Sequence, residues 1–312
     1  MIKNEIISVV ICTYNRSELA RQAIASVLAQ DFPQTDYDLV IVDNNSSDQT
    51  RAMAQEFCQS YPNVRYFLES KIGLSYARNR GWQEAAGKYV AYIDDDCKVP
   101  PTWLRAASKV IEQVRPAAFG GPYYAFYNSP KPAWFKDEYG SHVQGIVARS
   151  LKMDEYLCGG NMFLRLDILR KLGGFNTEFG MKGNKYSYGE ETELFHRLRM
   201  VFPDSVIYYD PALFVYHLVR AEKMKLMKVM RMSFDQGRDY AKFIEDIPNP
   251  KTQHFAFQAV EILLKNVKSV SWDMVWRDRN LYPFHQNFLY EVSFELVMDL
   301  GFSLGRLREK VV

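Results

Sequence analysis

Three adjacent aspartates close the apolar run YVAYIDDD at residues 89–96. Desolvating a carboxylate is costly, and carboxylates at contact range repel one another. A divalent cation relieves both costs, and Mg²⁺ and Mn²⁺ prefer oxygen ligands. Alternation along a strand sends Asp94 and Asp96 to one side and Asp95 to the other. The spacing predicts a metal site at the carboxyl end of a strand, where open α/β sheets bind ligands. The alternative is a solvated acidic turn ahead of a helix near Pro101.

Alternating strand and helix patterns indicate the scaffold that holds these acids. Mostly apolar runs predict buried strands at 7–12, 38–42, 64–68 and 89–93. Between them the patterns predict a helix capped by Ser17, helices over 50–59 and 74–86, and the polar loop 43–48. This order is typical of an α/β fold with a mostly parallel, doubly wound sheet.

The second half of the chain is less regular. We expect extended chain over 117–127, a loop-rich stretch over 128–157, helices over 166–172 and 190–200, and a strand over 206–209. From Leu218 the pattern turns helical, and residues 220–242 mix basic side chains with methionines. Such a helix fits an anionic membrane surface, but packing on the catalytic core is the favoured interpretation.

Composition excludes several classes of protein. The 312 residues are 47% hydrophobic and 24% charged, which is ordinary for a soluble globular protein. The net charge of +2 gives no case for a nucleic-acid partner. No apolar stretch is long enough to span a bilayer, and the amino terminus lacks the features of a signal peptide. The cysteines are far apart in sequence and indicate reduced thiols in a cytoplasmic protein, namely Cys12, Cys58, Cys97 and Cys158.

Several short motifs occur in a fixed order. They are SVVICTYNR (8–16), VDNNSSDQT (42–50), GLSYARNRG (73–81), YIDDD (92–96), GGNMFLR (159–165), GGF (173–175), GEETELFHRLR (189–199) and VYH (215–217). Together they resemble the family-two glycosyltransferases, which use the GT-A fold. The resemblance implies a catalytic domain over 1–217, with a nucleotide-binding half (1–127) and an acceptor half (128–217). The region 218–312 is then a helical extension that packs on the core or on a membrane.

The same resemblance implies a nucleotide-diphosphate sugar donor, UDP-type favoured, and a Mn²⁺ or Mg²⁺ ion. Asp94 and Asp96 match the family's D-x-D motif, and His217 is implied as a third metal or diphosphate contact. The implied nucleotide-binding residues are Cys12, Thr13, Tyr14, Asn15, Asp43, Asn44, Arg78, Asn79, Asp94 and Asp95. Alternatives remain for some of them, because DNNSSD also fits a polar turn and Arg78 a structural salt bridge.

An acid pair at the start of a helix matches the family's general base. Glu191 falls where the family usually carries a catalytic aspartate, with Glu190 before it. A carboxylate there can take the proton of the acceptor hydroxyl. The implied sugar and acceptor residues are Gly159, Gly160, Asn161 and Arg197. Both acids also suit the first turn of any helix, and Arg197 also suits a structural salt bridge.

These observations predict a metal-dependent, inverting glycosyltransferase. The chain has no Q-x-x-R-W motif and no predicted membrane span, which argues against a processive synthase. We expect single-sugar transfer to a saccharide or lipid-linked saccharide in surface polysaccharide or glycolipid assembly. The enzyme would be cytoplasmic, or peripheral on the inner face of the plasma membrane. The alternatives are a non-catalytic nucleotide-sugar-binding scaffold, and a nucleotidyltransferase, which the absence of a phosphate-binding glycine loop disfavours.

Overall fold

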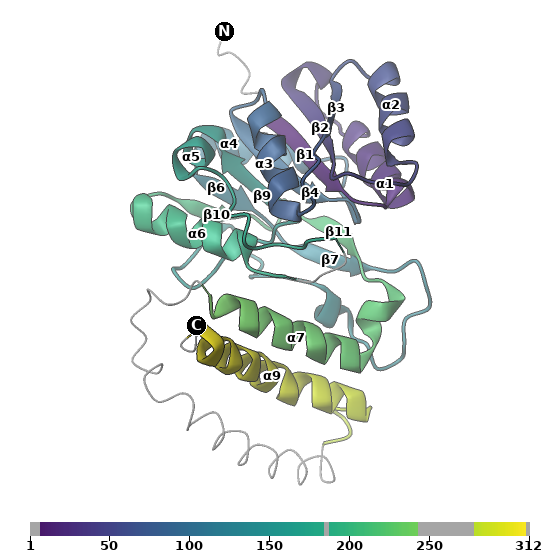
Figure 1. Ribbon diagram of the computed structural model, residues 1–312, viewed down its shortest axis with the longest axis vertical. Helices are drawn as coiled ribbons and strands as arrows, with labels where there is room; N and C mark the ends of the chain where they lie inside the picture. The colour runs from purple at the N-terminus through teal and green to yellow at the C-terminus, as the bar shows by residue number, and fades with distance from the viewer. Residues whose placement is uncertain (1–6, 184–186, 243–277, 310–312) are drawn as a thin grey trace. The chain divides into compact units, whose positions relative to one another are not determined.

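The computed structural model describes residues 7–183, 187–242 and 278–309 (Figure 1). The chain forms two compact units. The first holds the described parts of Met1–Phe126, Gly140–Asn184 and Glu190–Leu218, and the second those of Tyr127–Tyr139, Lys185–Gly189 and Val219–Val312. Residues 243–277 and 310–312 of the predicted helical extension lie outside the described residues.

The first unit is built on an eight-stranded sheet in the order β3-β2-β1-β4-β9-β6-β10-β8. The strands are β1 (Ile7–Thr13), β2 (Tyr37–Asp43), β3 (Val64–Leu68), β4 (Tyr89–Asp94), β6 (Ala118–Gly120), β8 (Arg149–Ser150), β9 (Asn161–Arg165) and β10 (Ile207–Tyr209). Strands β1 to β4 are parallel, which confirms the predicted core of the sheet. Strand β9 runs antiparallel between β4 and β6, and its five residues are absent from the predicted strands.

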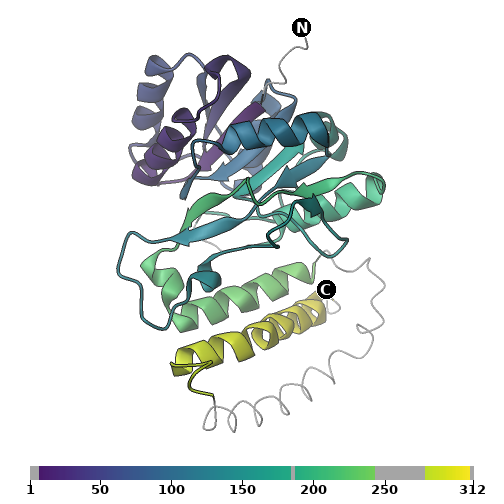
Figure 2. The ribbon, with the colours of Figure 1, turned by 180° about the vertical axis from the view of Figure 1, so that it is seen from behind.

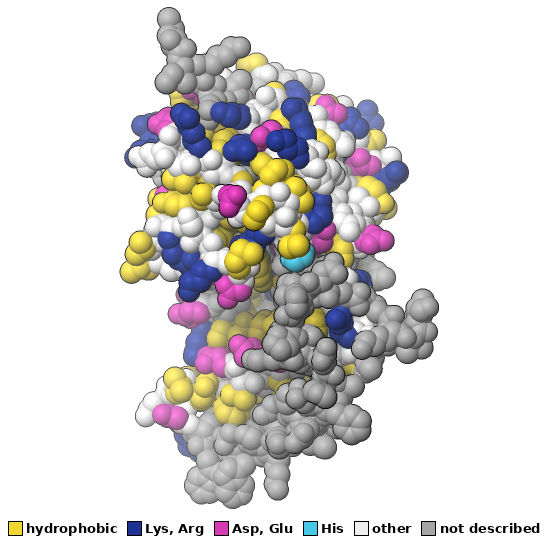
Figure 3. Space-filling view, turned by 90° about the vertical axis from the view of Figure 1, so that its left-hand side faces the viewer, with side chains coloured by type: hydrophobic (Ala, Val, Ile, Leu, Met, Phe, Trp, Pro, Cys, Tyr) yellow, Lys and Arg dark blue, Asp and Glu magenta, His cyan; other side chains and the backbone are white. Residues whose placement is uncertain are grey.

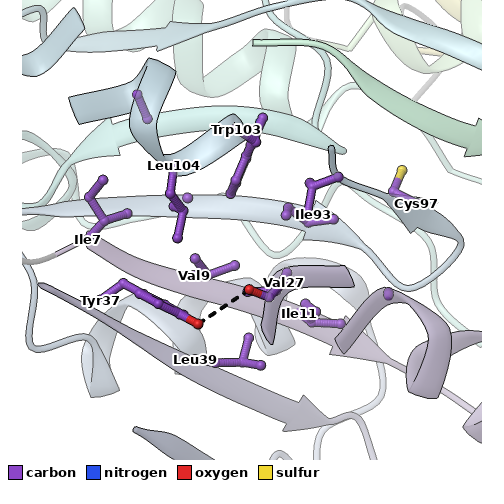
Figure 4. Close-up of a cluster of buried hydrophobic side chains, with 14 of the residues drawn as sticks. Ile7, Val9, Ile11, Val27, Tyr37, Leu39, Ile93, Cys97, Trp103 and Leu104 are labelled. Atoms are coloured by element: carbon purple, nitrogen blue, oxygen red, sulfur yellow. Dashed lines mark hydrogen bonds between the residues drawn. The ribbon is translucent and has the colours of Figure 1, made fainter. Parts of the chain in front are cut away.

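Helices cover both faces of this sheet (Figures 1 and 2). One buried cluster joins it to α1 (Ser17–Leu28), α2 (Thr50–Ser60) and α4 (Trp103–Gln113), and the other to α3 (Leu74–Glu84), α5 (Leu166–Leu172) and α6 (Glu190–Val201). Figure 4 shows the first cluster, where the Tyr37 hydroxyl donates to the carbonyl of Val27 at 3.4 Å. Buried, near-continuous apolar strands require this double cover, so the doubly wound prediction is confirmed.

A second, three-stranded sheet in the same unit consists of β5 (Cys97–Lys98), β11 (Val215–Leu218) and β7 (Tyr123–Phe126). The predicted extended stretch 117–127 is therefore two strands in different sheets, β6 and β7, separated by Gly121 and Pro122. A Cβ on Gly121 would lie 2.5 Å from the carbonyl oxygens of Asp210 and Leu213, so only glycine fits this crossing.

The described part of the second unit is helical. It contains η3 (Ala221–Met224), α7 (Leu226–Tyr240) and α9 (His285–Glu309). Helices α7 and α9 pack backbone to backbone, since a Cβ on Gly237 would overlap the Met298 carbonyl and one on Gly301 the Phe234 carbonyl. The ring of Tyr139, from the short helix η2 (Asp137–Gly140), stacks on Tyr290 of α9 at 3.9 Å.

Some predicted helix ends were wrong, for reasons outside local sequence. Ser17 is the first residue of α1 and makes no side-chain cap; instead its amide donates to Asp48 Oδ2 at 3.0 Å. The helix expected near Pro101 begins at Trp103, and α3 ends at Glu84, two residues early. Among the described helices, none has the length and apolarity needed to cross a bilayer.

Helix α3 lies close to β1 at Gly81, where a Cβ would overlap Cγ1 of the buried Val10. In an open helix Gly→Ala stabilises by about 0.5–1 kcal/mol. We predict the opposite here, because overpacking costs roughly 1–3 kcal/mol. Urea unfolding should show Gly81→Ala destabilised and the double variant Gly81→Ala, Val10→Ala less destabilised than additivity requires. Strict additivity of the two substitutions would contradict this packing.

Candidate active site

A turn after β4 separates the side chain of Asp95 from those of Asp94 and Asp96. Strand β4 ends at Asp94, and the next two acids lie in the turn that leads to β5. Asp95 is buried and accepts hydrogen bonds from the Thr13 hydroxyl and from Arg16, both at 2.8 Å. Burial raises the pKa of Asp95 to about 6, with Arg16 opposing. Ligand atoms of Asp94, Asp96 and Cys97 lie within 4.8 Å of one another. Asp94 and Asp96 thus converge, although the turn rather than strand alternation separates them from Asp95.

His217 reaches this turn through the small sheet. It pairs with Cys97 in the β11–β5 register, and the amide of Leu218 donates to the carbonyl of Asp96 at 2.9 Å. As a result the His217 Nε2 lies 3.7 Å from Asp96 Oδ1. Two carboxylates and an imidazole are a donor set that suits Mn²⁺ or Mg²⁺. The Cys97 thiol also lies in this cluster, but Mn²⁺ and Mg²⁺ prefer oxygen ligands to sulfur.

A buried arginine joins the aspartates to the acid pair. Arg78 of α3 is 3% exposed and bonds Glu190 at 2.8 Å and Asp94 at 3.4 Å. Its guanidinium lies over the rings of Tyr92 and Phe175, at 5.9 Å and 5.5 Å from their centroids. The arginine therefore has one fixed position between two acids that are far apart in sequence.

The predicted glycines press against these same groups. A Cβ on Gly159 would overlap Nη2 of Arg78, and one on Gly160 would lie 2.6 Å from Asp94 Oδ2. The neighbouring Asn161 is fully buried. Its amide donates to the carbonyls of Pro122 and Leu213 at 3.1 Å and 2.6 Å, and it accepts from Trp103 Nε1 at 3.1 Å. Asn161 of β9 thus connects the chain before β7, the chain before β11 and helix α4 through buried hydrogen bonds.

Buried polar groups follow the second strand. Asp43 accepts the Ser46 amide at 2.8 Å and the Tyr66 hydroxyl at 3.0 Å. Asn44 donates to the carbonyl of Lys71 at 2.7 Å and accepts from the amide of Gly73 at 2.7 Å. The segment DNNSSD therefore forms the hydrogen-bonded turn that the sequence allowed, and Asn44 fixes the chain that leads into α3.

The end of β1 interlocks with this turn. The amide of Asn15 donates to Ser46 Oγ at 2.9 Å, and its side-chain oxygen accepts the amide of Ser47 at 2.7 Å. Thr13 binds Asp95, and Tyr14 is half-buried. Burial raises the pKa of the Cys12 thiol to about 12. Four of the implied nucleotide-binding residues thus lie at the carboxyl edge of the sheet, beside the aspartates; they are Cys12, Thr13, Tyr14 and Asn15.

The acid pair begins α6, and its two members differ in exposure. Glu190 is 6% exposed and is held by Arg78, whereas Glu191 is half-buried. Burial raises the pKa of Glu190 to about 8; the Glu191 charge adds to the shift and Arg78 opposes it. Glu191 also acts electrostatically on His142. Glu191 is therefore the more accessible of the two acids.

Two aromatic residues at the site have no role in the sequence motifs. The Tyr123 ring lies between His142, at 5.8 Å, and His217, at 5.0 Å. The backbone of His142 pairs with that of Tyr123 through an isolated bridge. These rings link the surroundings of Glu191 to the metal-ligand cluster. Only the fold brings them together, since His142 falls in a stretch without periodic pattern.

Asn79 and Arg197 hold the turn after α5. Asn79 donates to the carbonyl of Phe175 and accepts its amide, both at 2.8 Å. Arg197 donates to the carbonyls of Leu172 and Gly174 at 2.6 Å and 2.7 Å and pairs with Glu193. The hydrogen bonds described for Asn79 and Arg197 thus all join parts of the protein to one another.

Negative charge predominates at the site. Even without Glu190, whose raised pKa keeps it largely protonated at neutral pH, the carboxylates outnumber the arginines; the groups are Asp94, Asp95, Asp96 and Glu191 against Arg16 and Arg78. Like charges this close repel strongly where water is excluded. The surplus supports a cation-binding function for this edge of the sheet.

Comparison with known families identifies the chain. The family described as Glycosyl transferase family 2 matches residues 8–173, just over half of the sequence. The chain belongs to glycosyltransferase family 2. This transferase is 28% identical over 252 residues to the glucosyl-dolichyl phosphate glucuronosyltransferase of Haloferax volcanii. The alignment covers 78% of the transferase and 79% of that relative.

Solved structures confirm the predicted GT-A fold of the transferase. Staphylococcus aureus TarS 1–349 in complex with UDP-GlcNAc covers 98% of this chain, and the match spans 91% of TarS, with 15% identity and a TM-score of 0.55. The mannosyltransferase PcManGT of Pyrobaculum calidifontis, in complex with GDP-Man and Mn²⁺, gives a TM-score of 0.56 at 16% identity, covering 98% of this chain and 74% of its own.

Removing Arg78 should destabilise the transferase strongly. Arg78→Met leaves the buried Glu190 without its ion-pair partner, at a cost of roughly 3–5 kcal/mol when measured above pH 8, where Glu190 is ionised. Arg80→Met is the matched control, because Arg80 pairs with Glu84 near the surface and such pairs contribute only about 0.5 kcal/mol. Urea unfolding measures both variants. Equal losses would show that the Arg78 pairs contribute no more than a surface pair.

Glu190 should make stability depend on pH. Because its native pKa is about 8 against an ordinary 4.5, the native state binds a proton that the unfolded state releases in this window. The free energy of unfolding should therefore fall as pH rises from about 5 to 8. We expect a flatter slope for Glu190→Gln. Glu155→Gln is the control, since Arg149 lowers the pKa of Glu155 to about 2. A wild-type slope in Glu190→Gln would contradict the assignment.

Proposed function

We propose that this family-two glycosyltransferase moves one sugar from a nucleotide-diphosphate donor to an acceptor hydroxyl, with a divalent cation and inversion of the anomeric centre. The observation that carries the proposal is the convergence on Arg78 of Asp94, from the D-x-D motif, and the acid pair at the start of α6. A single in-line displacement needs a leaving-group site and a base site on opposite sides of one sugar. Arg78 ties together the two segments that would supply them.

Asp94, Asp96 and His217 would hold the cation, as their donor chemistry fits Mn²⁺ or Mg²⁺. The cation would neutralise charge on the departing diphosphate. PcManGT, in its structure with GDP-Man and Mn²⁺, shares the fold. Asp95, bonded to Thr13 and Arg16, would keep the end of β1 next to the cation ligands. The nucleotide would then bind along the ends of β1 and β2, which are joined by hydrogen bonds.

Glu191 would act as the general base. It is the more exposed acid of the pair and lies at the amino-terminal end of α6, where the helix dipole favours the carboxylate. Glu190 would position the pair through Arg78 rather than meet the acceptor. Gly159 and Gly160 would let the sugar approach the backbone closely, because neither position has room for a side chain.

The acceptor would be a saccharide carried on a lipid. The Haloferax relative is named for a glucosyl-dolichyl phosphate substrate, and it is similar over 78% of this chain. The enzyme would then work in surface polysaccharide or glycolipid assembly, as a cytoplasmic protein or a peripheral one on the inner face of the plasma membrane. Exposed Lys225, which precedes α7, and exposed Met227 and Arg231 within it would allow an anionic membrane contact for the second unit.

A thermal-shift screen with UDP, GDP, TDP and CDP, each with and without Mn²⁺, tests donor binding. Because a ligand that binds only the native state raises its melting temperature, we expect one metal-dependent nucleotide shift. Asp96→Asn should abolish the shift. Glu191→Gln should keep it and lower turnover roughly 10²–10⁴-fold. Asp167→Asn, a surface change on α5, is the control.

Two results would contradict the proposal. Full turnover in Glu191→Gln would place the base elsewhere. No shift with any nucleotide, together with no metal-dependent hydrolysis of sugar nucleotides by the wild type, would favour the non-catalytic scaffold.

A further inference from the structure

One surface of the first unit carries exposed apolar side chains close together in sequence. In the segment 143–153, Ile146 is 90% exposed, Val147 65% and Met153 75%. At the end of α6, Met200 and Val201 are also exposed, at 69% and 56%. Figure 3 shows hydrophobic side chains with Lys and Arg among them on the side that carries α5 and α6 in Figure 1.

Hydrogen bonds bring residues 144–155 back on themselves and place Lys152 beside the end of α6, where Met200 and Val201 lie. Arg149 donates to the carbonyl of Gln144 at 3.0 Å and pairs with Glu155 at 2.6 Å. Arg199 of α6 donates to the carbonyl of Lys152 at 2.7 Å. We name the exposed set the apolar tip; its members are Val143, Ile146, Val147, Met153, Met200 and Val201.

The charges around the apolar tip fit an anionic surface. Residues 143–153 contain Arg149 and Lys152 and no acidic residue. Two acids follow: Glu155 pairs with Arg149, and Asp154 interacts electrostatically with Arg199. Three basic side chains (Arg149, Lys152 and Arg199) thus stand against two acids, which leaves one positive charge in excess. Apolar side chains flanked by basic ones are the pattern by which proteins enter the boundary between lipid headgroups and acyl chains.

Both ends of the segment belong to the candidate active site. It begins after His142, which interacts with Glu191 and stacks on Tyr123. It leads through Cys158 to Gly159 and Gly160, which press against Arg78 and Asp94. The apolar tip is therefore joined by a few residues of chain to His142 on one side and to Gly159 and Gly160 on the other.

A second copy of the chain is a poorer occupant. The free edge of the sheet here is β8, which has only two residues, Arg149 and Ser150. Two residues offer too few backbone hydrogen bonds to extend the sheet into a neighbouring molecule. The apolar side chains are also on a loop and a helix end rather than on one flat face.

We propose that the apolar tip docks the first unit on an anionic lipid bilayer and so presents the active site to a membrane-held acceptor. The inference rests on the lipid-linked acceptor of the proposed function. The bilayer contact itself needs no donor, acceptor or metal, so it can be measured separately from sugar transfer.

Vesicle co-sedimentation of the full chain tests the contact, with phosphatidylcholine vesicles that contain phosphatidylglycerol. Moving one large apolar side chain from water to lipid changes partition by roughly tenfold. We expect Ile146→Glu, Val147→Glu to weaken binding about a hundredfold. Ile146→Trp should strengthen it, because tryptophan favours the membrane interface. Both sites are exposed, so the fold should be unchanged, and an unaltered melting temperature without ligand checks this.

Two control variants distinguish the apolar tip from other surfaces of the protein. Leu68→Glu, Leu281→Glu changes exposed leucines outside the apolar tip and should leave binding intact. Lys223→Glu, Lys225→Glu, Lys228→Glu tests the second unit. Binding that is lost only in this last variant, or is equal in all variants, would overturn the proposal, as would absence of wild-type binding. Tip-dependent binding without any nucleotide shift would instead leave the docking surface standing and count against the transferase mechanism.

Discussion

The site depends on one buried arginine, Arg78. Arg78 comes from α3, yet it bonds an acid at the end of β4 and another at the start of α6. A buried guanidinium is tolerated only where carboxylates and aromatic faces replace its lost water, and Tyr92 and Phe175 supply those faces. The requirement extends outward, since the room that Arg78 and Asp94 occupy excludes side chains at Gly159 and Gly160.

Backbone geometry does the remaining positioning. The turn after β4 sends Asp95 toward Thr13 and Arg16, which frees its two neighbours to converge. The small sheet sets His217 opposite Cys97 by strand register. Loops at the ends of β1 and β2 are locked by Asn15 and the serines of the second loop. The polar groups of this edge are thus held by hydrogen bonds before any substrate arrives, which is the arrangement that preorganised catalysis requires.

Sequence was sufficient where a signal is local. Buried apolar runs specified β1 to β4, and the D-x-D spacing specified the acids that converge. It was insufficient where tertiary contacts decide. Asp48 replaces Ser17 as the partner of the first amide of α1, and β9 takes its place through antiparallel pairing with β4 and β6, which are distant in sequence. Tyr123 and His142 meet only because a bridge joins His142 to the start of β7, and no sequence spacing predicts this stacked pair.

The pairing of His217 with Cys97 has a consequence for how the site comes into being. The residues joined there are separated by most of the first unit, so the contact has a high sequence separation and forms late in a chain that folds as it is synthesised. A nascent chain that stops short of β11 can hold both aspartates and still lack the imidazole. The three groups of the proposed cation site would then be complete only once β11 has been made and paired.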